Sequence, residues 1–468
     1  MTNTRPAVPL SVEDAPTSPR PVAHFTAENT WLNDPNGLLY HDGVYHLFFQ
    51  NNPFGDTWGN ISWGHATSTD LVSWVEQPVA IPATVDEMAF SGSAVADVRN
   101  TAGFAGPGQT ALVAIYTSAR PPLADGQSVQ AQSLAYSVDG GTSWTRYASN
   151  PVLDIGSAEF RDPKVSWYGG DDGNWVMVAV EATKFRVVIY TSDDLINWTL
   201  QSHFGPAHAV GGVWECPDLF PLTIRDTGET RWVLVVSLNP GSIAGGSGTQ
   251  YFIGDFDGHT FIPERLSDST ELATFDWLDY GRDYYAAVSF NDAPDGRRLM
   301  IGWASNWEYA NETPTHPWRS AMSLVREVNL VRSPDGRLRV TQEPVLPAEP
   351  SALTVFTITV PCAAGDRTEL ILTGATDDRV VLMIDGDERT ISSDRTHSGA
   401  VDFHPAFPSV DCAPLLTDSA NVQLTIVIDA MVLEVYVDDG AVTITQQIFP
   451  RAPLTSLRVE PISELTGV

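Results

Sequence analysis

Hydrophobic residues fall in short runs along the whole chain, and polar turn residues separate the runs. Residues 44–49, 111–116, 175–180 and 232–237 are examples, dense in Val, Ile, Leu, Tyr, Phe and Trp. Runs of this length, punctuated by Asp-Gly and Gly-Gly pairs, are typical of β-strands and hairpin turns. Long stretches with the 3.6-residue period of an amphipathic helix are missing. The pattern therefore predicts an all-β protein.

A degenerate motif recurs in the first half of the chain. Residues 68–74, 137–144 and 192–198 each begin with Ser, pass through a polar turn that contains Asp, and end with Trp. Each copy reads as the end of a strand, a hairpin turn and a Trp that opens the next strand, and residues 254–261 form a related hairpin. Trp74 and Trp144 are 70 residues apart, and Trp144 and Trp198 are 54 residues apart. Such a period fits one four-stranded blade of a β-propeller.

The repeats leave room for five blades, the fifth around residues 284–303. After the Pro-bearing stretch that ends at Pro350, the pattern changes to alternating strands such as residues 422–428 and 432–437, which are typical of a β-sandwich. The sequence therefore predicts a five-bladed β-propeller followed by a C-terminal β-sandwich. The expected divisions are a flexible arm over residues 1–22, the propeller over 23–336, a linker over 337–350 and the sandwich over 351–468.

The net charge of the chain disfavours some classes of binding partner. Lys and Arg number 26 against 58 Asp and Glu, which gives a formal net charge of −32 and disfavours binding to nucleic acids or to anionic membranes. A neutral substrate fits better, and the 14 Trp residues lean weakly towards carbohydrate, although most Trp side chains pack in cores. The same charge is also explained by an acidic surface that keeps a protein soluble. The oligomeric state is not readable from the sequence.

The spacing of the cysteines and the sequence of residues 1–20 indicate the expected cofactors and cellular location. Cys216, Cys362 and Cys412 have no metal-binding spacing, and a Cys362–Cys412 disulfide stays open. No metal or cofactor is expected. Residues 1–20 lack the basic start and apolar run of a signal peptide, and no run of about 18 apolar residues predicts a membrane span. The expected location is therefore cytoplasmic, or secreted if a leader precedes the sequence.

Three carboxylates follow or precede turn-forming residues. Asp34 and Asp162 each stand directly before Pro, Arg161 lies beside Asp162, and Glu215 lies among Trp, Cys and Val after two glycines. Taken singly, each has a plain alternative: Asp34 as a turn cap, Asp162 in a surface ion pair, and Glu215 at an exposed strand edge. Apolar surroundings would instead raise the pKa of Glu215, which suits a general acid.

The positions of the three carboxylates, taken together, favour a catalytic role. They fall in the first, third and fourth predicted blades at comparable strand positions, where the innermost strands of a propeller converge. Glycoside hydrolysis with retained configuration needs a nucleophilic carboxylate and a protonated carboxyl group about 5 to 5.5 Å apart. The sequence therefore predicts that Asp34, Asp162 and Glu215 form one catalytic site.

The same residues carry a family resemblance. Residues 31–37 (Trp-Leu-Asn-Asp-Pro-Asn-Gly), 90–93 (Phe-Ser-Gly-Ser), 160–163 (Phe-Arg-Asp-Pro) and 215–218 (Glu-Cys-Pro-Asp) resemble the motifs of glycoside hydrolase family 32, the family of β-fructofuranosidases, exo-inulinases and levanases. Residues 322–327 and 394–399 extend the resemblance through the rest of the chain. The resemblance implies a five-bladed propeller with a β-sandwich, in agreement with the periodicity.

The resemblance also implies roles for individual residues. Asp34 would be the nucleophile, Glu215 the acid/base, and Asp162 with Arg161 would bind fructose hydroxyls and stabilise the transition state. The other residues that match the fructose pocket are Asn33, Gln50, Trp58, Phe90, Ser91 and Trp318. For Trp58 and Phe90, core packing is the alternative.

The expected activity is release of fructose from the non-reducing end of levan- or inulin-type fructans, fructo-oligosaccharides and sucrose. Residues 51–65 and 245–251 look more like exo-inulinases and levanases than invertases. The alternative on the same scaffold is a fructosyltransferase or a difructose- or anhydride-forming levan enzyme. A silent sugar-binding propeller is disfavoured because all three carboxylate motifs are intact. The sequence does not fix the choice between β-2,1 and β-2,6 linkages.

Overall fold

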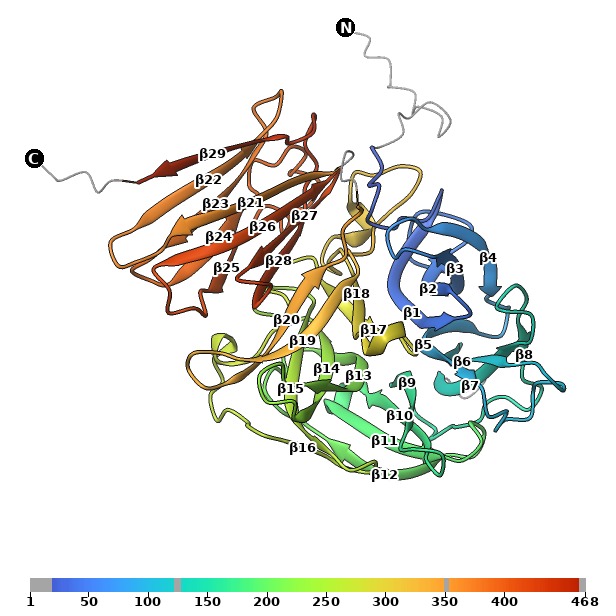
Figure 1. Cartoon of the computed structure of the whole chain (residues 1–468). Coiled ribbons are helices and arrows are strands. Elements are labelled where there is room, and N and C mark those ends of the chain that lie inside the picture. The colour runs from blue at the N-terminus through green and yellow to red at the C-terminus, as the bar shows by residue number, and fades with distance from the viewer. Residues whose placement is uncertain (1–18, 122–127, 349–352, 463–468) are drawn as a thin grey trace, which may run out of the picture.

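The structure is a computed structural model that describes residues 19–121, 128–348 and 353–462. Within these residues, consecutive strands form five four-stranded antiparallel sheets, followed by a sheet of four strands and a sheet of five. Figure 1 shows the first five sheets following one another around a common centre. The predicted all-β class and the five-bladed β-propeller with a C-terminal β-sandwich are confirmed.

The first strand of each blade lies at the centre of the propeller, and the fourth lies at its rim (Figure 1). The first three blades consist of β1 (Trp31–His41), β2 (Val44–Asn52), β3 (Ser62–Ser68) and β4 (Val75–Ile81); β5 (Met88–Asp97), β6 (Ala111–Arg120), β7 (Val129–Ser137) and β8 (Thr145–Arg146); and β9 (Phe160–Tyr168), β10 (Asn174–Glu181), β11 (Arg186–Ser192) and β12 (Thr199–Phe204). The last two consist of β13 (Val213–Thr223), β14 (Thr230–Asn239), β15 (Gly248–Phe256) and β16 (Phe261–Pro263); and β17 (Tyr285–Ser289), β18 (Leu299–Trp303), β19 (Arg326–Arg332) and β20 (Leu338–Pro344). Short 3₁₀ helices in the described residues are η2 (Ala182–Lys184), η3 (Leu272–Thr274), η4 (Pro294–Gly296) and η5 (Ala310–Glu312).

Burial explains why the inner strands read as continuous apolar runs. Strand β6 is buried along nearly its whole length because neighbouring blades cover both of its faces, whereas the outer strand β12 is mostly exposed. A strand that is covered on both faces loses the alternation of polar and apolar residues. The most regular hydrophobic runs of the sequence are therefore middle strands such as β6, β10 and β14.

The recurring Ser–Asp–Trp motif is the hairpin between the third and fourth strands of a blade. Asp70 accepts hydrogen bonds from the backbone N–H groups of Val72 and Ser73, at 2.9 and 2.7 Å. Asp194 does the same for Ile196 and Asn197 in the third blade. The carboxylate thus closes the turn in place of a backbone carbonyl. The predicted reading of this motif is confirmed.

The ring closes between the first and fifth blades. Backbone hydrogen bonds join Tyr40 N to Asn291 O at 3.0 Å and Asn291 N to Leu38 O at 2.9 Å, and a parallel bridge pairs Trp31 with Arg319. Each blade is made from four consecutive strands, so no strand of the described residues is exchanged between first and last blades. Closure brings β1 beside β17, and the two strands then face the same centre.

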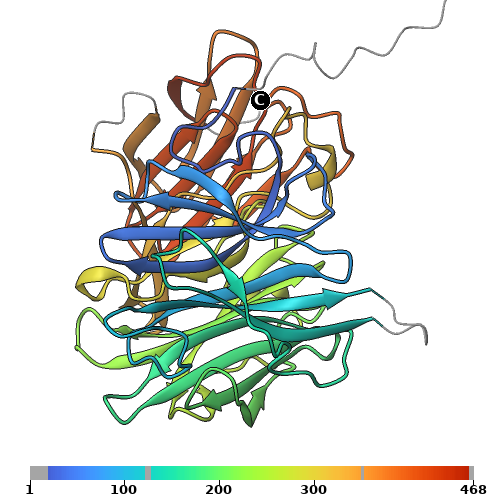
Figure 2. The same cartoon turned by 90° about the vertical axis from the view of Figure 1, so that its right-hand side faces the viewer.

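The sandwich lies to one side of the propeller in Figures 1 and 2. Its four-stranded sheet has the order β21 (Thr354–Pro361), β26 (Asn421–Asp429), β27 (Val432–Val437) and β28 (Val442–Gln447). Its five-stranded sheet has the order β25 (Val410–Pro414), β24 (Thr390–Asp394), β23 (Arg379–Asp385), β22 (Arg367–Thr373) and β29 (Ser456–Pro461). The two inner faces meet in a core of aliphatic side chains that includes Leu370, Leu382, Ile426 and Val435.

Buried ion pairs join the sandwich to the propeller. Arg326, on β19, lies 3.0 Å from Asp279 and 3.0 Å from Glu434 on β27, and all three side chains are almost completely buried. Arg395 of the sandwich pairs with Asp283 at 2.5 Å. Charges buried this deeply are stable only when they are paired and hydrogen-bonded. Both arginines belong to the segments whose sequence resembles the family outside the carboxylate motifs.

The boundary between the domains differs from the expected one. Strand β20, Leu338–Pro344, pairs with β19 and completes the fifth blade, although it lies in the range expected to be a linker. The Asp335-Gly336 pair, which marked the end of the propeller in the sequence, is the hairpin turn between these strands, closed by Ser333 N to Arg337 O at 2.8 Å. We propose that the propeller extends to Pro344.

Only part of the N-terminal arm that was expected over residues 1–22 lies within the described residues. Residues 1–18 of the expected arm lie outside the described residues, whereas Val22 and Ala23 donate backbone hydrogen bonds to Asp429 of the sandwich.

Cys216, Cys362 and Cys412 are free, so the disulfide that was left open is not formed. No helix in residues 19–121, 128–348 and 353–462 is long and apolar enough to cross a membrane.

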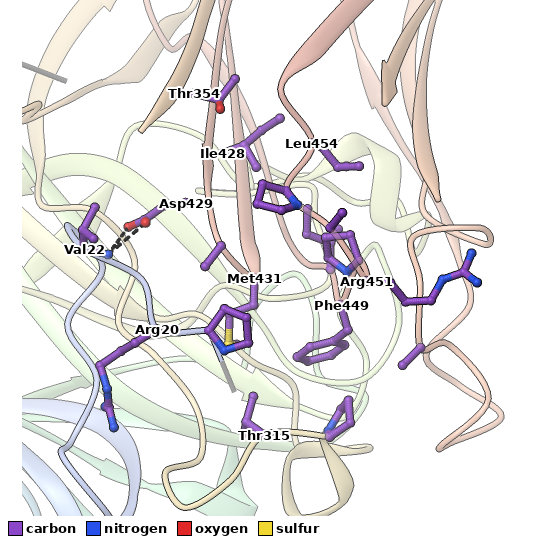
Figure 3. A pocket seen from close by; sticks show the side chains of 18 residues that line it. Arg20, Val22, Thr315, Thr354, Ile428, Asp429, Met431, Phe449, Arg451 and Leu454 are labelled. Carbon is purple, nitrogen blue, oxygen red and sulfur yellow. Dashed lines mark hydrogen bonds between the residues drawn. The ribbon is translucent and has the colours of Figure 1, made fainter. Parts of the chain in front are cut away.

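A cavity of about 360 Å³ lies at the junction of the two domains (Figure 3). Met431 and Phe449 of the sandwich line it, with Arg20 and Val22 of the N-terminal segment and Thr315 of a propeller loop. Asp34, Asp162 and Glu215 do not line this cavity. The opening at the junction is therefore separate from the carboxylates.

Candidate active site

Every innermost strand of the five described blades has an irregular register close to its N-terminal end. The shifts fall between Leu32 and Pro35 in β1, Phe90 and Gly92 in β5, Arg161 and Lys164 in β9, Glu215 and Asp218 in β13, and Tyr285 and Val288 in β17. Bulges of this kind turn side chains out of the regular alternation and are common beside active sites. The five bulges bring polar side chains from all five blades to one end of the central axis.

Three residues at these bulges have left-handed backbone conformations. The φ angles are 61° for Asp162, 47° for Cys216 and 52° for Ala286. Residues with a Cβ rarely adopt this region, and it costs of the order of 1–3 kcal/mol when the surroundings impose it. At Asp162 and Cys216 the conformation places a carboxylate and a backbone N–H so that they bond to each other, at 2.9 Å.

Asp34 is held through both carboxylate oxygens. Asn33 Nδ2 donates to Oδ1 at 2.9 Å, and Ser91 Oγ donates to Oδ2 at 2.6 Å. Asn33 is itself oriented by the indole N–H of Trp31, which donates to Asn33 Oδ1 at 2.7 Å. A carboxylate that accepts a hydrogen bond at each oxygen is fixed in one orientation, as a nucleophile must be.

Asp162 is the most enclosed of the three carboxylates. Its Oδ2 accepts the backbone N–H of Cys216, and Arg161 Nε lies 3.9 Å from the same oxygen. Burial raises the pKa of Asp162, Arg161 opposes the increase, and the nearby charges of Glu215 and Asp34 add to it. Carboxylates that share one site resist being ionised at the same time, so the charge of each raises the pKa of the others.

Glu215 has a different donor on each oxygen. Arg161 Nε donates to Oε1 at 3.1 Å, and the phenolic hydroxyl of Tyr285 donates to Oε2. Burial raises the pKa of Glu215 and the charge of Asp34 adds to this, while Arg161 and Tyr285 oppose the increase by stabilising the carboxylate. The side chain keeps 22% exposure, so solvent and substrate reach it. These are the properties of a group that alternates between acid and carboxylate.

Cys216 connects the carboxylates. Its Sγ lies 3.6 Å from Asp34 Oδ2 and 3.8 Å from Asp162 Oδ2, and its peptide follows Glu215 directly. All three carboxylates therefore lie around one residue, and Arg161 is the basic side chain that contacts two of them. Among the described residues, no group of three or more His, Cys, Asp or Glu side chains has an arrangement that could hold a metal ion.

Arg161 is anchored away from the carboxylates as well as to them. One terminal nitrogen, Nη1, donates to Glu159 Oε2 at 2.7 Å and to Gln130 Oε1 at 3.1 Å. Burial alone would lower the pKa of Arg161, but the surrounding acidic charges outweigh it and raise the pKa. The guanidinium thus stays charged and fixed between Asp162 and Glu215.

The residues expected to line a sugar pocket divide into two groups. Asn33 and Ser91 bond to Asp34 directly, and Gln50 Nε2 donates to Ala89 O at 3.1 Å, on the strand that carries Ser91. Trp58 is 43% exposed and meets Phe90 edge to face, with ring centroids 6.2 Å apart. The Phe90 ring is partly buried against a core cluster that contains Trp31 and Cys216, so only Trp58 of this pair is largely exposed.

Trp318 is placed differently. Its side chain is completely buried and packs with Ala304, Ala321, Met431 and Val432, where the propeller meets the sandwich. No hydrogen bond or ring contact joins it to the carboxylates within the described residues, although its neighbour Arg319 pairs with Trp31. Its place in the sugar pocket stays a prediction that this packing does not favour.

Three site residues were absent from the sequence prediction: Tyr285, Cys216 and Gln130. Tyr285 opens β17, the innermost strand of the fifth blade, in the position that corresponds to the carboxylate motifs of other blades. Extending the blade alignment to residues 284–287 would have found it. Cys216 lies inside the Glu-Cys-Pro-Asp motif, and only its backbone conformation shows what it does. Gln130 belongs to no sequence motif. Its role depends on the contact with Arg161, which lies on a different blade.

Comparisons with known proteins cover both domains. The family model described as "Glycosyl hydrolases family 32 N-terminal domain" matches residues 24–344, and "Glycosyl hydrolases family 32 C terminal" matches residues 330–465. Among solved structures, exo-inulinase from Aspergillus awamori superposes with a TM-score of 0.83 at 40% sequence identity, covering 94% of this chain and 95% of that one.

Curated relatives agree with the structural match. An extracellular exo-inulinase of Aspergillus ficuum is 42% identical over 91% of this chain and 89% of its own length. A levanase of Bacillus subtilis is 42% identical over 92% of this chain and 66% of its own length. Invertase 2 of Saccharomyces cerevisiae is 45% identical over 67% of this chain and 58% of its own length.

Proposed function

The chain belongs to glycosyl hydrolase family 32, and from this membership we propose that Asp34 is its catalytic nucleophile and Glu215 its general acid and base. The protein is a β-fructosidase that releases fructose from fructans and sucrose. The observation that carries the residue assignment is the contrast between the two carboxylates. Asp34 is fixed by Asn33 and Ser91, whereas Glu215 is bonded to two groups that shift its protonation.

The first chemical step forms a fructosyl-enzyme. Asp34 attacks the anomeric carbon of the terminal fructose, and the bond from that carbon to the glycosidic oxygen breaks. Glu215 gives its proton to the departing oxygen, so the leaving sugar departs as a neutral alcohol and Glu215 becomes a carboxylate. Its raised pKa supports this role, because more of the enzyme then carries the proton at the start of the step.

The second step returns the enzyme to its starting state. The Glu215 carboxylate takes a proton from water, and the water oxygen attacks the anomeric carbon and displaces Asp34. Fructose leaves with the configuration it had in the substrate, since two displacements have taken place at the same carbon. The Arg161 and Tyr285 donors stabilise Glu215 in its carboxylate form between the two steps.

Asp162 and Arg161 bind and stabilise rather than react. In this proposal, Asp162 accepts hydrogen bonds from fructose hydroxyls, and these bonds strengthen as positive charge develops on the ring. In the same proposal, Asn33, Gln50 and Ser91 contact the fructose unit, and Trp58 with Phe90 provides an apolar wall for the carbon face of the sugar. The substrate is a neutral carbohydrate.

Timed product analysis tests this function. The purified protein is incubated with levan, inulin, short fructo-oligosaccharides and sucrose, and products are separated at early times. Free fructose from the first time point is expected, and the rates rank the β-2,1 and β-2,6 linkages. Difructose, an anhydride or longer oligomers as first products would instead establish the transferase or anhydride-forming alternative.

The cellular location needs its own measurement. The cytoplasmic location expected from residues 1–20 stays a prediction, and it is not supported by the Aspergillus ficuum relative, which is named an extracellular enzyme. Immunoblots of the culture medium and of the cell lysate, taken from the source organism during growth on a fructan, decide between the two.

A further inference from the structure

Lys164 and Asp218 are buried charged residues that the proposed reaction does not use. Lys164 is on β9, two residues after Asp162, and Asp218 is on β13, three residues after Glu215. Lys164 Nζ lies 3.6 Å from Asp218 Oδ2, and the two side chains are only 7% and 0% exposed. Burial of two charges often costs more free energy than their mutual attraction returns, so such a pair is weak evidence for a purely stabilising role.

The pair also binds the backbone of a third strand. Asp218 Oδ2 accepts the backbone N–H of Ser289 at 2.6 Å, and Lys164 Nζ donates to the carbonyl oxygen of the same residue. Ser289 is the last residue of β17, four residues after Tyr285. We call Lys164, Asp218 and the Ser289 backbone the axial clamp. It joins β9, β13 and β17, which are the innermost strands of three different blades (Figure 1).

The axial clamp lies directly after the bulges of these strands. Regular pairing resumes at Lys164 in β9 and at Asp218 in β13, and Ser289 is the second residue to pair after the bulge of β17. The three strands belong to different sheets, so within the described residues no ladder of backbone hydrogen bonds sets the distances between them. These distances therefore depend on side-chain contacts such as the axial clamp.

Hydrogen bonds of the carboxylate site cross between the same three strands. Arg161 on β9 and Tyr285 on β17 both donate to Glu215 on β13. Each of these residues is the last to pair regularly before the bulge of its strand. The axial clamp and the bonds to Glu215 thus lie on opposite sides of the same bulges. A small shift of β9 against β13 would lengthen the bond from Arg161, and hydrogen bonds weaken steeply with poorer geometry.

The charges of the axial clamp depend on each other. Burial lowers the pKa of Lys164, and the Asp218 carboxylate opposes this decrease, so the pairing favours the charged form of Lys164. Asp218 Oδ1 is buried and has no hydrogen-bond partner within the described residues, so Asp218 is held through Oδ2. Neutralising both residues together therefore removes the ion pair without leaving a lone buried charge.

We propose that Lys164 and Asp218 are positioning residues, which hold β9 against β13 and β17 and thereby keep Arg161 in hydrogen-bonding contact with Glu215. The inference rests on the proposed acid/base role of Glu215. Neither residue touches the substrate in this proposal. Their loss affects the reaction through Arg161, which opposes the rise in the pKa of Glu215.

Two variants separate positioning from folding. Lys164→Met/Asp218→Asn replaces both charges with neutral side chains of similar size, and the asparagine oxygen still accepts the Ser289 N–H. Because replacement of a whole buried pair is often close to neutral for stability, this double variant should unfold near the wild-type temperature. It lacks the bond from Lys164 to the Ser289 carbonyl. Asp218→Asn alone is the milder variant, since it keeps Lys164 and weakens only the pairing.

Arg337→Met is the matched control. Arg337 also pairs with a carboxylate between the fourth and fifth blades, Asp276 at 2.7 Å, but it lies in the turn between β19 and β20. Asp276 keeps Arg265 at 3.6 Å and Arg339 at 3.8 Å when Arg337 is replaced. Thermal unfolding and the pH profile of kcat/KM for sucrose are measured for the wild type and all variants.

The double variant is expected to lower kcat/KM about tenfold, as a displaced contact at a reacting group does. Its alkaline limb should move upwards by about half a pH unit, because Glu215 loses part of the stabilisation that Arg161 gives its carboxylate. Asp218→Asn should give both changes to a smaller extent, and it decides the matter if the double variant does not fold. Arg337→Met should change neither quantity.

A folded double variant with the wild-type kcat/KM and alkaline limb would show that the axial clamp only stabilises the fold. A loss of activity with the limb in its wild-type position also overturns the positioning role, since a smaller fraction of active protein gives that result. Glu215→Gln is measured alongside. If it keeps wild-type activity and the same alkaline limb, the proposed acid/base role fails, whatever the clamp variants show.

Discussion

The phenolic hydroxyl of Tyr285 donates a hydrogen bond to Glu215 Oε2, while Arg161 donates to Oε1 of the same carboxylate. Both donors stabilise the charged form of Glu215 and oppose the effect of burial, which raises its pKa. The protonation of Glu215 thus reflects a balance between burial, which raises its pKa, and these two donors from other blades, which lower it. Its titration is sensitive to single changes in its surroundings.

Tyr285→Phe is expected to raise the pKa of Glu215, because it removes a donor to the carboxylate and leaves the ring in place. The alkaline limb of the kcat/KM profile should move upwards by about one pH unit, the effect of one hydrogen bond of roughly 1.4 kcal/mol. Tyr284→Phe is the matched control, since Tyr284 is equally buried and its hydroxyl has no hydrogen-bond partner within the described residues. A limb that stays in place, or moves to lower pH, would show that Tyr285 does not act on Glu215.

Asp162→Asn keeps the shape of the side chain and its bond to the Cys216 N–H but removes the charge. The change is expected to cost about 3 kcal/mol of transition-state stabilisation, or roughly a hundredfold in kcat/KM. Asp97→Asn serves as control, because Asp97 is also buried and bonds to backbone N–H groups, but of Thr101 and Ala102. If both variants lose the same activity, the loss reflects damage to the fold rather than to fructose binding.

His24 predicts how stability depends on pH. Its imidazole is completely buried between Asp429, at 2.8 Å, and Glu434, at 3.2 Å, and these hydrogen bonds outweigh burial and raise the pKa of His24 from 6.5 to about 9. A group whose pKa is raised on folding stabilises the protein fully below its unfolded pKa of about 6.5. The stabilisation is then lost as the pH rises through about 9.

Wild-type protein should therefore lose about 3 kcal/mol of unfolding free energy between pH 6.5 and pH 9.5, relative to His24→Gln. The glutamine keeps a polar, neutral side chain at this position but does not titrate. Urea unfolding of the two proteins at several pH values gives the difference directly. Parallel pH dependences would mean that His24 is neutral in the folded protein.

Much of this architecture could be predicted from the sequence because the information is local. An Asp-containing hairpin marks the last two strands of a blade in the sequence. The bonds of Asp70 and Asp194 to the following backbone N–H groups show that the carboxylate closes this turn. The carboxylate motifs also predicted correctly which blades carry Asp34, Asp162 and Glu215. Turn chemistry and motif spacing are visible within about ten residues of the chain.

The missed features depend on pairing between distant segments. Asp335-Gly336 has the composition of both a hairpin turn and a domain boundary, and only the pairing of β20 with β19 distinguishes them. Tyr285 has no motif of its own, and its role depends on the contact with Glu215, 70 residues earlier. The burial of Trp318 likewise depends on Met431 and Val432 of the other domain.

Azide rescue separates the roles of the two carboxylates. Glu215→Ala should be nearly inactive, because neither the leaving group nor the attacking water receives help with its proton. With an aryl β-fructofuranoside, whose leaving group needs no proton, azide should restore turnover and give a fructosyl azide of retained configuration. Asp34→Ala should not be rescued to a retained product. The reverse pattern would exchange the roles assigned to Asp34 and Glu215.

Trapping the covalent intermediate tests most directly whether Asp34 is the nucleophile. Glu215→Ala is mixed with an aryl β-fructofuranoside, quenched in acid and digested, and the peptides are analysed by mass spectrometry. The peptide containing Asp34 should gain the mass of one fructosyl unit, and fragmentation should place this unit on the Asp34 carboxylate. A fructosyl unit on a different residue, or aryl group release with no labelled peptide at any time, would contradict the assignment of Asp34 as the nucleophile.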